Sequence, residues 1–184
     1  MAAPRRTSPF RSLSGNNPGP MASLEELLTK VDSFPVHQGQ PGAPRRRLTV
    51  LTCMDARIDP AALLGLNPGD AHVIRNAGGV ATDDAIRSIA MSQRLLDTTA
   101  ILVIQHTGCG IHVVEPETLK DSIAAETGER PAWEAPVEVT PEETLERTIR
   151  ILRESPAIPH RDMIAGTVID LVGSGDPAVA SPQD

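Results

Sequence analysis

Two short segments hold the residues best suited to chemistry, and each follows a run of apolar residues. They are residues 53–57 (CMDAR) and 106–110 (HTGCG), and together they contain both cysteines of the chain. Two thiolates and one imidazole can bind zinc as three protein ligands, leaving a fourth position for water or a carboxylate. The sequence therefore predicts a zinc site formed by Cys53, His106 and Cys109.

The apolar runs in front of these segments, residues 48–52 and 100–105, are short and rich in branched side chains. Such runs are typical of strands buried on both faces. If the two strands are parallel neighbours, the residues after them emerge at one edge of the sheet, where α/β proteins gather their ligand sites. Cys53 would then lie beside His106 and Cys109, provided that the turn between the last two is tight.

Three motifs, taken together, resemble those of the β-class carbonic anhydrases. They are C-x-D-x-R at 53–57, R-N-A-G at 75–78 and H-x-x-C at 106–109. Their order and spacing agree with that family across roughly residues 48–172. The compact length and residues 72–88 are most similar to the small actinobacterial members, a subgroup that also resembles carbonyl sulfide hydrolases.

The resemblance implies a lyase, carbonate dehydratase, with one Zn²⁺ per subunit bound by Cys53, His106 and Cys109. The expected reaction is the reversible hydration of CO₂ to bicarbonate by zinc-bound hydroxide. Asp55 and Arg57 match the catalytic dyad beside the metal. Members of the family are at least homodimers, in which an N-terminal helix packs on the partner and the partner supplies part of the pocket wall.

The residues themselves suggest how such a site could work. Zinc bound by two thiolates carries less positive charge than zinc bound by three histidines, so it acidifies its water less. Asp55 could orient the hydroxide through a hydrogen bond, and Arg57 would keep Asp55 ionised and correctly turned. Because CO₂ is small and apolar, we expect Gly78 and Gly79 to offer backbone N–H groups to it and Val80 to supply apolar surface.

Each of these residues also has a structural explanation. Cys53 and Cys109 could be small buried hydrophobes, and Asp55 and Arg57 could be a surface ion pair. His112 could relay protons or face solvent as a spectator. In some members of the resembled family the carboxylate that Asp55 matches binds zinc as a fourth ligand and closes the site at lower pH. The sequence does not distinguish an open site from a closed one.

Three functions are therefore open. Hydration of CO₂ is the first, and hydrolysis of carbonyl sulfide at the same zinc site is the second. In many members of the resembled family, aromatic residues of the partner line the pocket, and here only Phe34 is placed by sequence to do this. The assignment of CO₂ rather than its sulfur analogue is therefore weaker. The third function is a non-catalytic, zinc-stabilised binding module in which the fourth ligand position is permanently filled.

Composition excludes several other classes of function. The net charge of −7 and the absence of a basic stripe outside the N-terminus argue against nucleic acid as a partner. No apolar run approaches the ~20 residues that span a bilayer, so no membrane association is expected. Two cysteines in an acidic chain without a signal peptide predict metal ligation in a reducing cytoplasm rather than a disulfide.

The expected fold class is α/β: one domain with a mostly parallel sheet of four to five strands flanked by helices, in a dimer. This zinc-binding domain should occupy residues 48–175. A disordered segment (1–20), a helix with a linker (21–47) and a tail (176–184) would surround it. Helices are predicted after Ser23 and Thr82 and at 60–66, 117–126 and 142–154, and further strands at 71–74 and 163–172.

Overall fold

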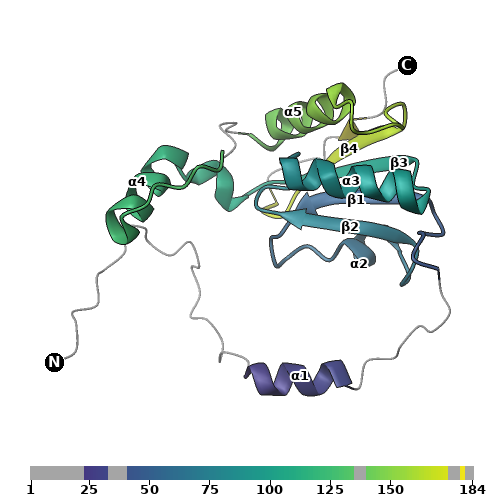
Figure 1. The fold of residues 1–184 in the computed structure, drawn as a ribbon, viewed down its shortest axis with the longest axis horizontal. Helices are drawn as coiled ribbons and strands as arrows, with labels where there is room; N and C mark the ends of the chain where they lie inside the picture. Colours follow the sequence, from purple (N-terminus) through teal and green to yellow (C-terminus); the bar gives the residue numbers. More distant parts are fainter. Residues whose placement is uncertain (1–22, 33–40, 135–139, 174–178, 181–184) are drawn as a thin grey trace. The chain divides into compact units, whose positions relative to one another are not determined.

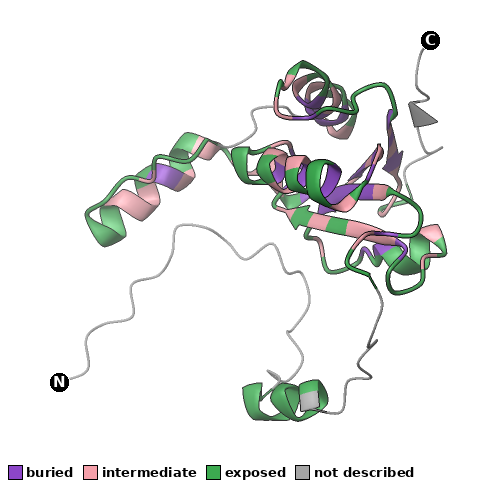
Figure 2. Ribbon diagram, turned by 45° about the vertical axis from the view of Figure 1, so that its right-hand side comes forward, coloured by how far each residue is buried: buried purple, intermediate pink, exposed green. Residues whose placement is uncertain are grey.

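The computed structural model of the chain describes residues 23–32, 41–134, 140–173 and 179–180. The chain divides into two compact units, residues 1–40 and 41–184. The described part of the first unit is the predicted helix α1 (Leu24–Asp32). Its apolar side chains share one face at helical spacing, and all are exposed, as Figure 2 shows. This α1 stripe consists of Leu24, Leu27, Leu28 and Val31.

The second unit is built on a sheet whose described strands have the order β2-β1-β3-β4-β5. The strands are β1 (Leu48–Cys53), β2 (Ala71–Asn76), β3 (Ala100–His106), β4 (Ile164–Ile169) and β5 (Val179–Ala180). The first four pair in parallel, and β5 is antiparallel to β4. The predicted fold class, a mostly parallel sheet of four to five strands, is confirmed. The strands that end in Cys53 and His106 are neighbours.

Two parts of the sheet differ from the prediction. Strand β4 ends at Ile169 rather than at Val172, because the Asp170 carboxylate accepts hydrogen bonds from the N–H groups of Val172 and Gly173 and turns the chain. Strand β5 lies in the segment 176–184, which was predicted as a tail. A strand of two residues carries no alternation of polar and apolar positions that a sequence could display.

The helices of this unit lie close to their predicted positions. They are α2 (Pro60–Leu64), α3 (Asp83–Leu96), α4 (Pro116–Thr127) and α5 (Pro141–Glu154), with a 3₁₀ turn, η1, at Gly110–Val113. Thr82 caps α3 by accepting a hydrogen bond from the Ala85 N–H, as its sequence predicts. Helix α2 stops at Leu64 because Gly65 adopts a left-handed conformation. None of the described helices combines the length and the apolar character that crossing a membrane requires.

The main core lies where α3 and α5 cover the same side of the sheet (Figure 1). Apolar residues of both helices and of the three central strands are buried there: Leu51, Ala85, Ile89, Ile101, Val103, Leu145, Leu152, Ile164 and Val168. Burial of these side chains is the main force that holds β1 and β3 in register. A second cluster contains Cys53, Ile58 and Cys109, so the two sulfurs lie in an apolar environment.

A cluster of hydroxyl groups lies at the edge of the sheet opposite to Cys53 and His106. Thr49, Ser92 and Thr98 are buried and hydrogen-bonded to one another at 2.7 to 3.3 Å. His72 joins this hydroxyl cluster through Nδ1, 2.7 Å from the Ser92 hydroxyl, and its Nε2 lies 3.1 Å from the Gly42 carbonyl. Because a carbonyl only accepts, Nε2 donates to it. These contacts give His72 a structural role in its strand.

Candidate metal centre

The ends of β1 and β3 bring the three predicted zinc ligands together. One donor atom from each of Cys53, His106 and Cys109 lies within 4.8 Å of the others, and all three residues are buried. The two sulfur atoms are 3.8 Å apart. Parallel pairing of β1 with β3 causes this meeting, because both strands deliver their following residues to the same edge.

The imidazole of His106 is oriented for a ligand. Its Nδ1 lies 2.9 Å from the Thr107 carbonyl, so Nδ1 carries the proton and Nε2 presents a lone pair. That Nε2 is buried without a hydrogen bond of acceptable geometry among the described residues. Burial opposes the charged imidazole, yet contacts with the Cys53 sulfur and Thr107 hold the pKa of His106 above its ordinary value. A buried lone pair is costly unless something binds it, so this nitrogen is placed to bind a ligand.

The Cys53 sulfur is prepared to carry negative charge. Hydrogen bonds from Cys109 and from the backbone N–H groups of Asp55 and Gly78 lower the pKa of the Cys53 thiol, against the effect of burial. The shared contact with Cys53 and burial together raise the pKa of Cys109. A metal ion would displace the proton that Cys109 keeps. Two sulfurs and one imidazole nitrogen suit zinc, and the residues present therefore fit it.

Asp55 and Arg57 form a two-pronged ion pair beside this cluster. Arg57 Nε lies 2.9 Å from Asp55 Oδ1, and its Nη2 lies 2.8 Å from Oδ2. This contact with Arg57 holds the pKa of the Asp55 carboxyl far below its usual range. The same Nη2 also donates to the Gly108 carbonyl at 3.2 Å. Asp55 Oδ2 is 3.9 Å from His106 Nε2, so the pair reaches the edge of the metal cluster.

Arg75 and Asn76 support this site, and sequence reasoning assigned neither of them a contact there. Arg75 donates from Nε to the Cys53 carbonyl at 3.0 Å and from Nη2 to the Asp55 carbonyl at 2.7 Å. Asn76 bonds both the N–H and the carbonyl of Val80, at 2.9 and 2.8 Å. The R-N-A-G motif includes these positions, but Arg75 and Asn76 bind backbone atoms. Every residue has such atoms, so the sequence does not reveal which of them are bound.

The three residues predicted to contact the substrate lie next to the cluster but use their amides internally. The Gly78 N–H points to the Cys53 sulfur. The Gly79 N–H donates to the Asn76 carbonyl at 3.2 Å, and Val80 is buried. Gly79 has φ +60°, and a Cβ there would lie 2.7 Å from the Cys53 nitrogen. Only glycine fits this close approach to the ligand strand.

His112, just after the metal loop, makes a contact with helix α5. His112 Nε2 lies 3.0 Å from the Thr144 hydroxyl, which itself donates to the Thr140 carbonyl, so His112 donates to Thr144. His112 thus ties the metal loop to the first turn of α5. Phe34, expected to face a partner's pocket, lies outside the described residues.

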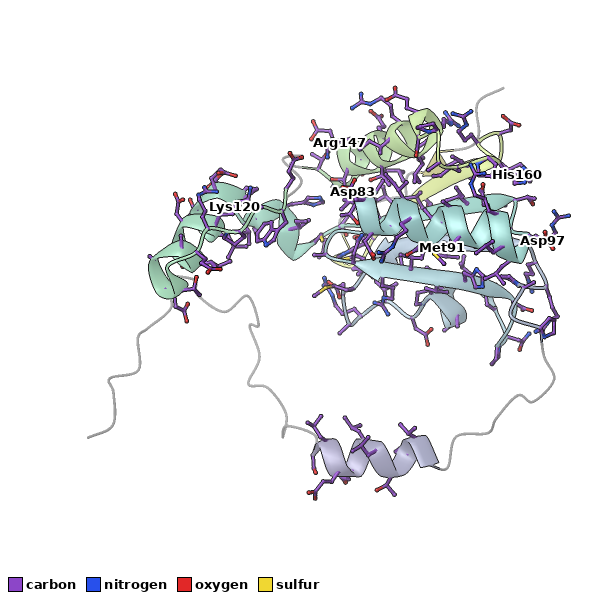
Figure 3. All side chains as sticks on the ribbon, viewed as in Figure 1. Asp83, Met91, Asp97, Lys120, Arg147 and His160 are labelled. Carbon is purple, nitrogen blue, oxygen red and sulfur yellow. The ribbon has the colours of Figure 1, made fainter. Side chains whose placement is uncertain are left out.

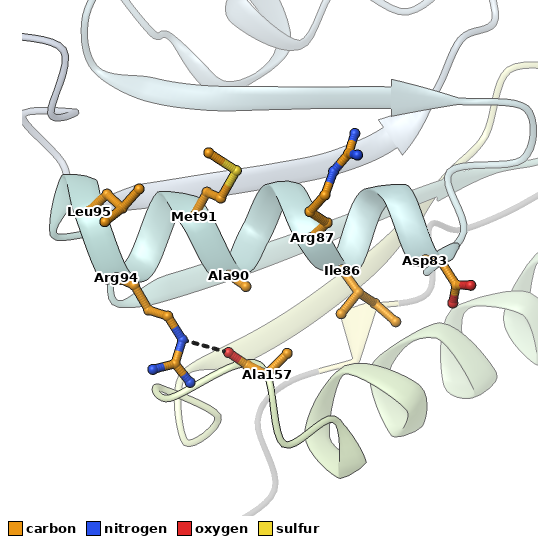
Figure 4. A pocket seen from close by; sticks show the side chains of 8 residues that line it. All are labelled: Asp83, Ile86, Arg87, Ala90, Met91, Arg94, Leu95 and Ala157. Carbon is orange, nitrogen blue, oxygen red and sulfur yellow. Dashed lines mark hydrogen bonds between the residues drawn. The ribbon is translucent and has the colours of Figure 1, made fainter.

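A pocket on the outer face of α3 is separate from this cluster. Figure 3 labels Asp83 and Met91 at this face, and Figure 4 shows the side chains that line the pocket. Its volume is about 520 Å³. The Arg94 side chain closes one end by donating to the Ala157 carbonyl at 3.0 Å. None of the three clustered ligands lines the pocket. The chemistry of the donor atoms, rather than the size of a hollow, therefore identifies the candidate site.

Comparisons of sequence relate the chain to known proteins. The sequence model of the family described as carbonic anhydrase matches residues 48–148. Beta-carbonic anhydrase 1 of Mycobacterium tuberculosis is 40% identical over 131 residues, which are 71% of this chain and 80% of that protein. A carbon disulfide hydrolase of Acidithiobacillus thiooxidans is 34% identical over 151 residues, covering 70% of this chain and 75% of that protein.

Solved structures share the fold. A carbonic anhydrase from Streptococcus mutans superposes with a TM-score of 0.73 at 31% identity, over 88% of this chain and 99% of the other. The apo form of a carbon disulfide hydrolase superposes with a TM-score of 0.62 at 30% identity, over 79% of this chain and 84% of the other. The likeness extends over most of the chain and includes both kinds of enzyme.

Proposed function

Because the chain belongs to the β-carbonic anhydrase family, we propose that it catalyses the zinc-dependent, reversible hydration of carbon dioxide to bicarbonate. The observation that carries this proposal is the buried cluster of two sulfurs and one imidazole nitrogen, with its donor atoms within 4.8 Å of one another. An ionised carboxylate stands beside the cluster, held by an arginine. Hydration of CO₂ needs these two parts: a cation site and a fixed hydrogen-bond acceptor next to it.

Cys53, His106 and Cys109 would hold one zinc ion per subunit. When bound, zinc lowers the pKa of a water molecule so that a hydroxide nucleophile is available near neutral pH. The amides of Asp55 and Gly78 that point to the Cys53 sulfur withdraw part of its charge. They would thereby offset the weaker acidifying power of a site with two thiolates.

Asp55 would orient the nucleophile. Its Oδ2 lies 3.9 Å from His106 Nε2 and would accept a hydrogen bond from the attacking water, directing an oxygen lone pair toward the substrate carbon. Arg57 holds both carboxylate oxygens, so Asp55 stays ionised and directed beside the cluster. This pairing supports the open form of the site, in which Asp55 is not itself a ligand. Val80 would give the substrate apolar surface, beside the backbone of Gly78 and Gly79.

Stopped-flow measurement of CO₂ hydration, combined with zinc analysis, tests this proposal. We expect Asp55→Asn to keep one zinc per chain and to lose roughly 100-fold in rate, since residues that orient a metal site contribute 10- to 100-fold. Cys109→Ala should lose both zinc and activity. Full activity in Asp55→Asn would contradict the role of the carboxylate, and a wild-type protein without zinc would overturn the proposal.

A second candidate is the hydrolysis of a sulfur analogue of CO₂. Similarity to carbon disulfide hydrolases at 34% identity over 70% of this chain favours testing it. Carbonyl sulfide and carbon disulfide are longer and more polarisable than CO₂, so the space beside Val80 would decide which substrate fits. Sulfide release from each compound, measured on the same zinc-loaded preparation as CO₂ hydration, ranks the three substrates. A zinc-loaded protein inactive on all three would instead be a binding module.

We also propose that the protein is a homodimer or a larger homo-oligomer, in the cytoplasm. The exposed α1 stripe supports association, because an apolar helix face gains stability when it is covered. Both cysteines are free thiols, which suits a reducing compartment. Sedimentation of wild type and Leu27→Glu tests the first point: the variant should dissociate, and unchanged mass would contradict a role for the stripe.

A further inference from the structure

The orientation of His106 depends on a single backbone oxygen. Nδ1 of the ring donates to the carbonyl of Thr107, 2.9 Å away, and this bond aims Nε2 at the two sulfurs. This carbonyl belongs to the peptide between Thr107 and Gly108 and turns with it. Whatever holds these two residues in place therefore also fixes the ligand nitrogen.

Thr107 is held by the segment that follows β4. Its N–H donates to the Ile169 carbonyl at 3.0 Å. Its hydroxyl donates to Asp170 Oδ1 at 2.7 Å and accepts the Leu171 N–H at 3.0 Å. The same carboxylate oxygen accepts the N–H groups of Val172 and Gly173, at 3.0 Å each. One carboxylate thus organises a turn and fastens the metal loop to it.

The two loops also fit closely in shape. Gly108 has φ +64°, and a Cβ at this position would lie 2.6 Å from Val172 Cγ1. Cys109, the next ligand, packs with Ile169 and Leu171 in the apolar cluster beside the metal site. The metal loop therefore has little freedom to shift while the turn at Asp170 is intact.

We propose that Thr107 and Asp170 form a latch that positions His106 for metal binding, an inference that rests on the metal site of the proposed function. The latch contacts neither the metal nor the substrate. Its hydroxyl–carboxylate bond, together with the close packing of Gly108 on Val172, holds the peptide between Thr107 and Gly108, whose carbonyl orients the ring. Groups that hold a ligating histidine through its second nitrogen typically change metal affinity 10- to 100-fold when they are lost.

Thr107→Val removes the hydroxyl and keeps the shape of the side chain, and Thr107→Ser restores the hydroxyl. Thr49→Val is the matched control, since Thr49 is also buried and hydrogen-bonded but belongs to the hydroxyl cluster at the opposite edge of the sheet. The measured quantities are the zinc dissociation constant, from chelator competition, and the melting temperature of the metal-free protein. Zinc affinity separates positioning of the ligand from general support of the fold.

We expect Thr107→Val to bind zinc roughly 10- to 100-fold more weakly, and Thr107→Ser to recover most of the loss. Thr49→Val should lower the melting temperature and leave zinc affinity unchanged. Asp170→Ala should weaken zinc binding as Thr107→Val does, and the double variant should bind no more weakly than either alone, because both changes open the same latch.

Unchanged zinc affinity in Thr107→Val would overturn the latch and leave the proposed function standing. Equal loss of affinity in Thr49→Val would also overturn it, because the effect would then follow stability. A wild-type protein that binds no zinc would instead remove the metal site itself. If Thr107→Val does not fold, Thr107→Ser and Asp170→Ala decide the test. Loss of zinc affinity in Asp170→Ala but not in Thr107→Ser supports the latch, and unchanged affinity in Asp170→Ala overturns it.

Discussion

Arg57 acts through the geometry of its guanidinium as much as through its charge. It contacts both oxygens of Asp55 and the Gly108 carbonyl, and a lysine ammonium cannot reproduce this fork. We expect Arg57→Lys to retain zinc and to hydrate CO₂ roughly 10-fold more slowly, as measured by stopped flow. Arg87→Lys, which alters the exposed pair of Arg87 with Asp84, is the matched control and should match wild type. If Arg57→Lys and Arg87→Lys hydrate CO₂ at the same rate, the positive charge of Arg57 is sufficient and the geometry of its guanidinium is not needed.

Asp70 links the protein's stability to pH. The Asn67 N–H and the guanidinium of Arg45 hold the pKa of this carboxyl below its usual value. Because the pKa in the folded state is lower than the unfolded pKa of about 3.9, the ionised carboxyl stabilises the fold at pH values above this unfolded pKa. This stabilisation is lost as the pH falls through the folded pKa. Compared with the metal-free wild type, metal-free Asp70→Asn should therefore have a lower free energy of unfolding at pH 6. It should also lose less of this free energy between pH 5 and pH 3, as measured by urea unfolding. The exposed Glu126→Gln is the control and should follow wild type at both pH values.

At the scale of elements, two glycines with the same backbone angle make a sharp comparison. Gly65 and Gly79 both have φ +60°, but a Cβ on Gly65 would meet no atom within 4 Å, whereas one on Gly79 would collide with the backbone of Thr52 and Cys53. Gly65→Ala should cost about 1 kcal/mol for the left-handed conformation. Gly79→Ala should cost clearly more and weaken zinc binding, because β1 must move. Chemical denaturation and chelator competition measure the two effects.

The elements were predictable where their signal is local. The runs that end at Cys53 and His106 have the continuous apolar character of buried parallel strands, and Thr82 marks the start of α3 because it caps that helix. The three ligand residues were placed at one edge on the assumption that the two strands are parallel neighbours, as the sheet now shows them to be. The supports of the site were not predictable, because Arg75 and Asp170 bind backbone groups that only the folded chain brings near.

At the scale of the whole molecule, a bound metal should raise global stability. A ligand that binds only the folded state stabilises it by RT ln(1 + [L]/Kd), which is about 4 kcal/mol at a thousandfold excess over Kd. We expect a chelator to lower the melting temperature of wild type and added zinc to restore it. Cys109→Ser should melt at the same temperature with and without chelator. A chelator effect of equal size in this variant would assign the stabilisation to another site.

The order of the strands has a consequence for how the protein matures. Cys53 ends a strand made early, but its neighbour β3 enters the sheet only after β2 and α3 have been synthesised. Zinc therefore has no complete binding site until β3 docks beside β1. Loading should follow folding rather than guide it, so refolding rates would be the same with and without zinc while unfolding slows. A cell short of zinc would then hold a reserve of folded, empty enzyme, ready for activation once the ion returns.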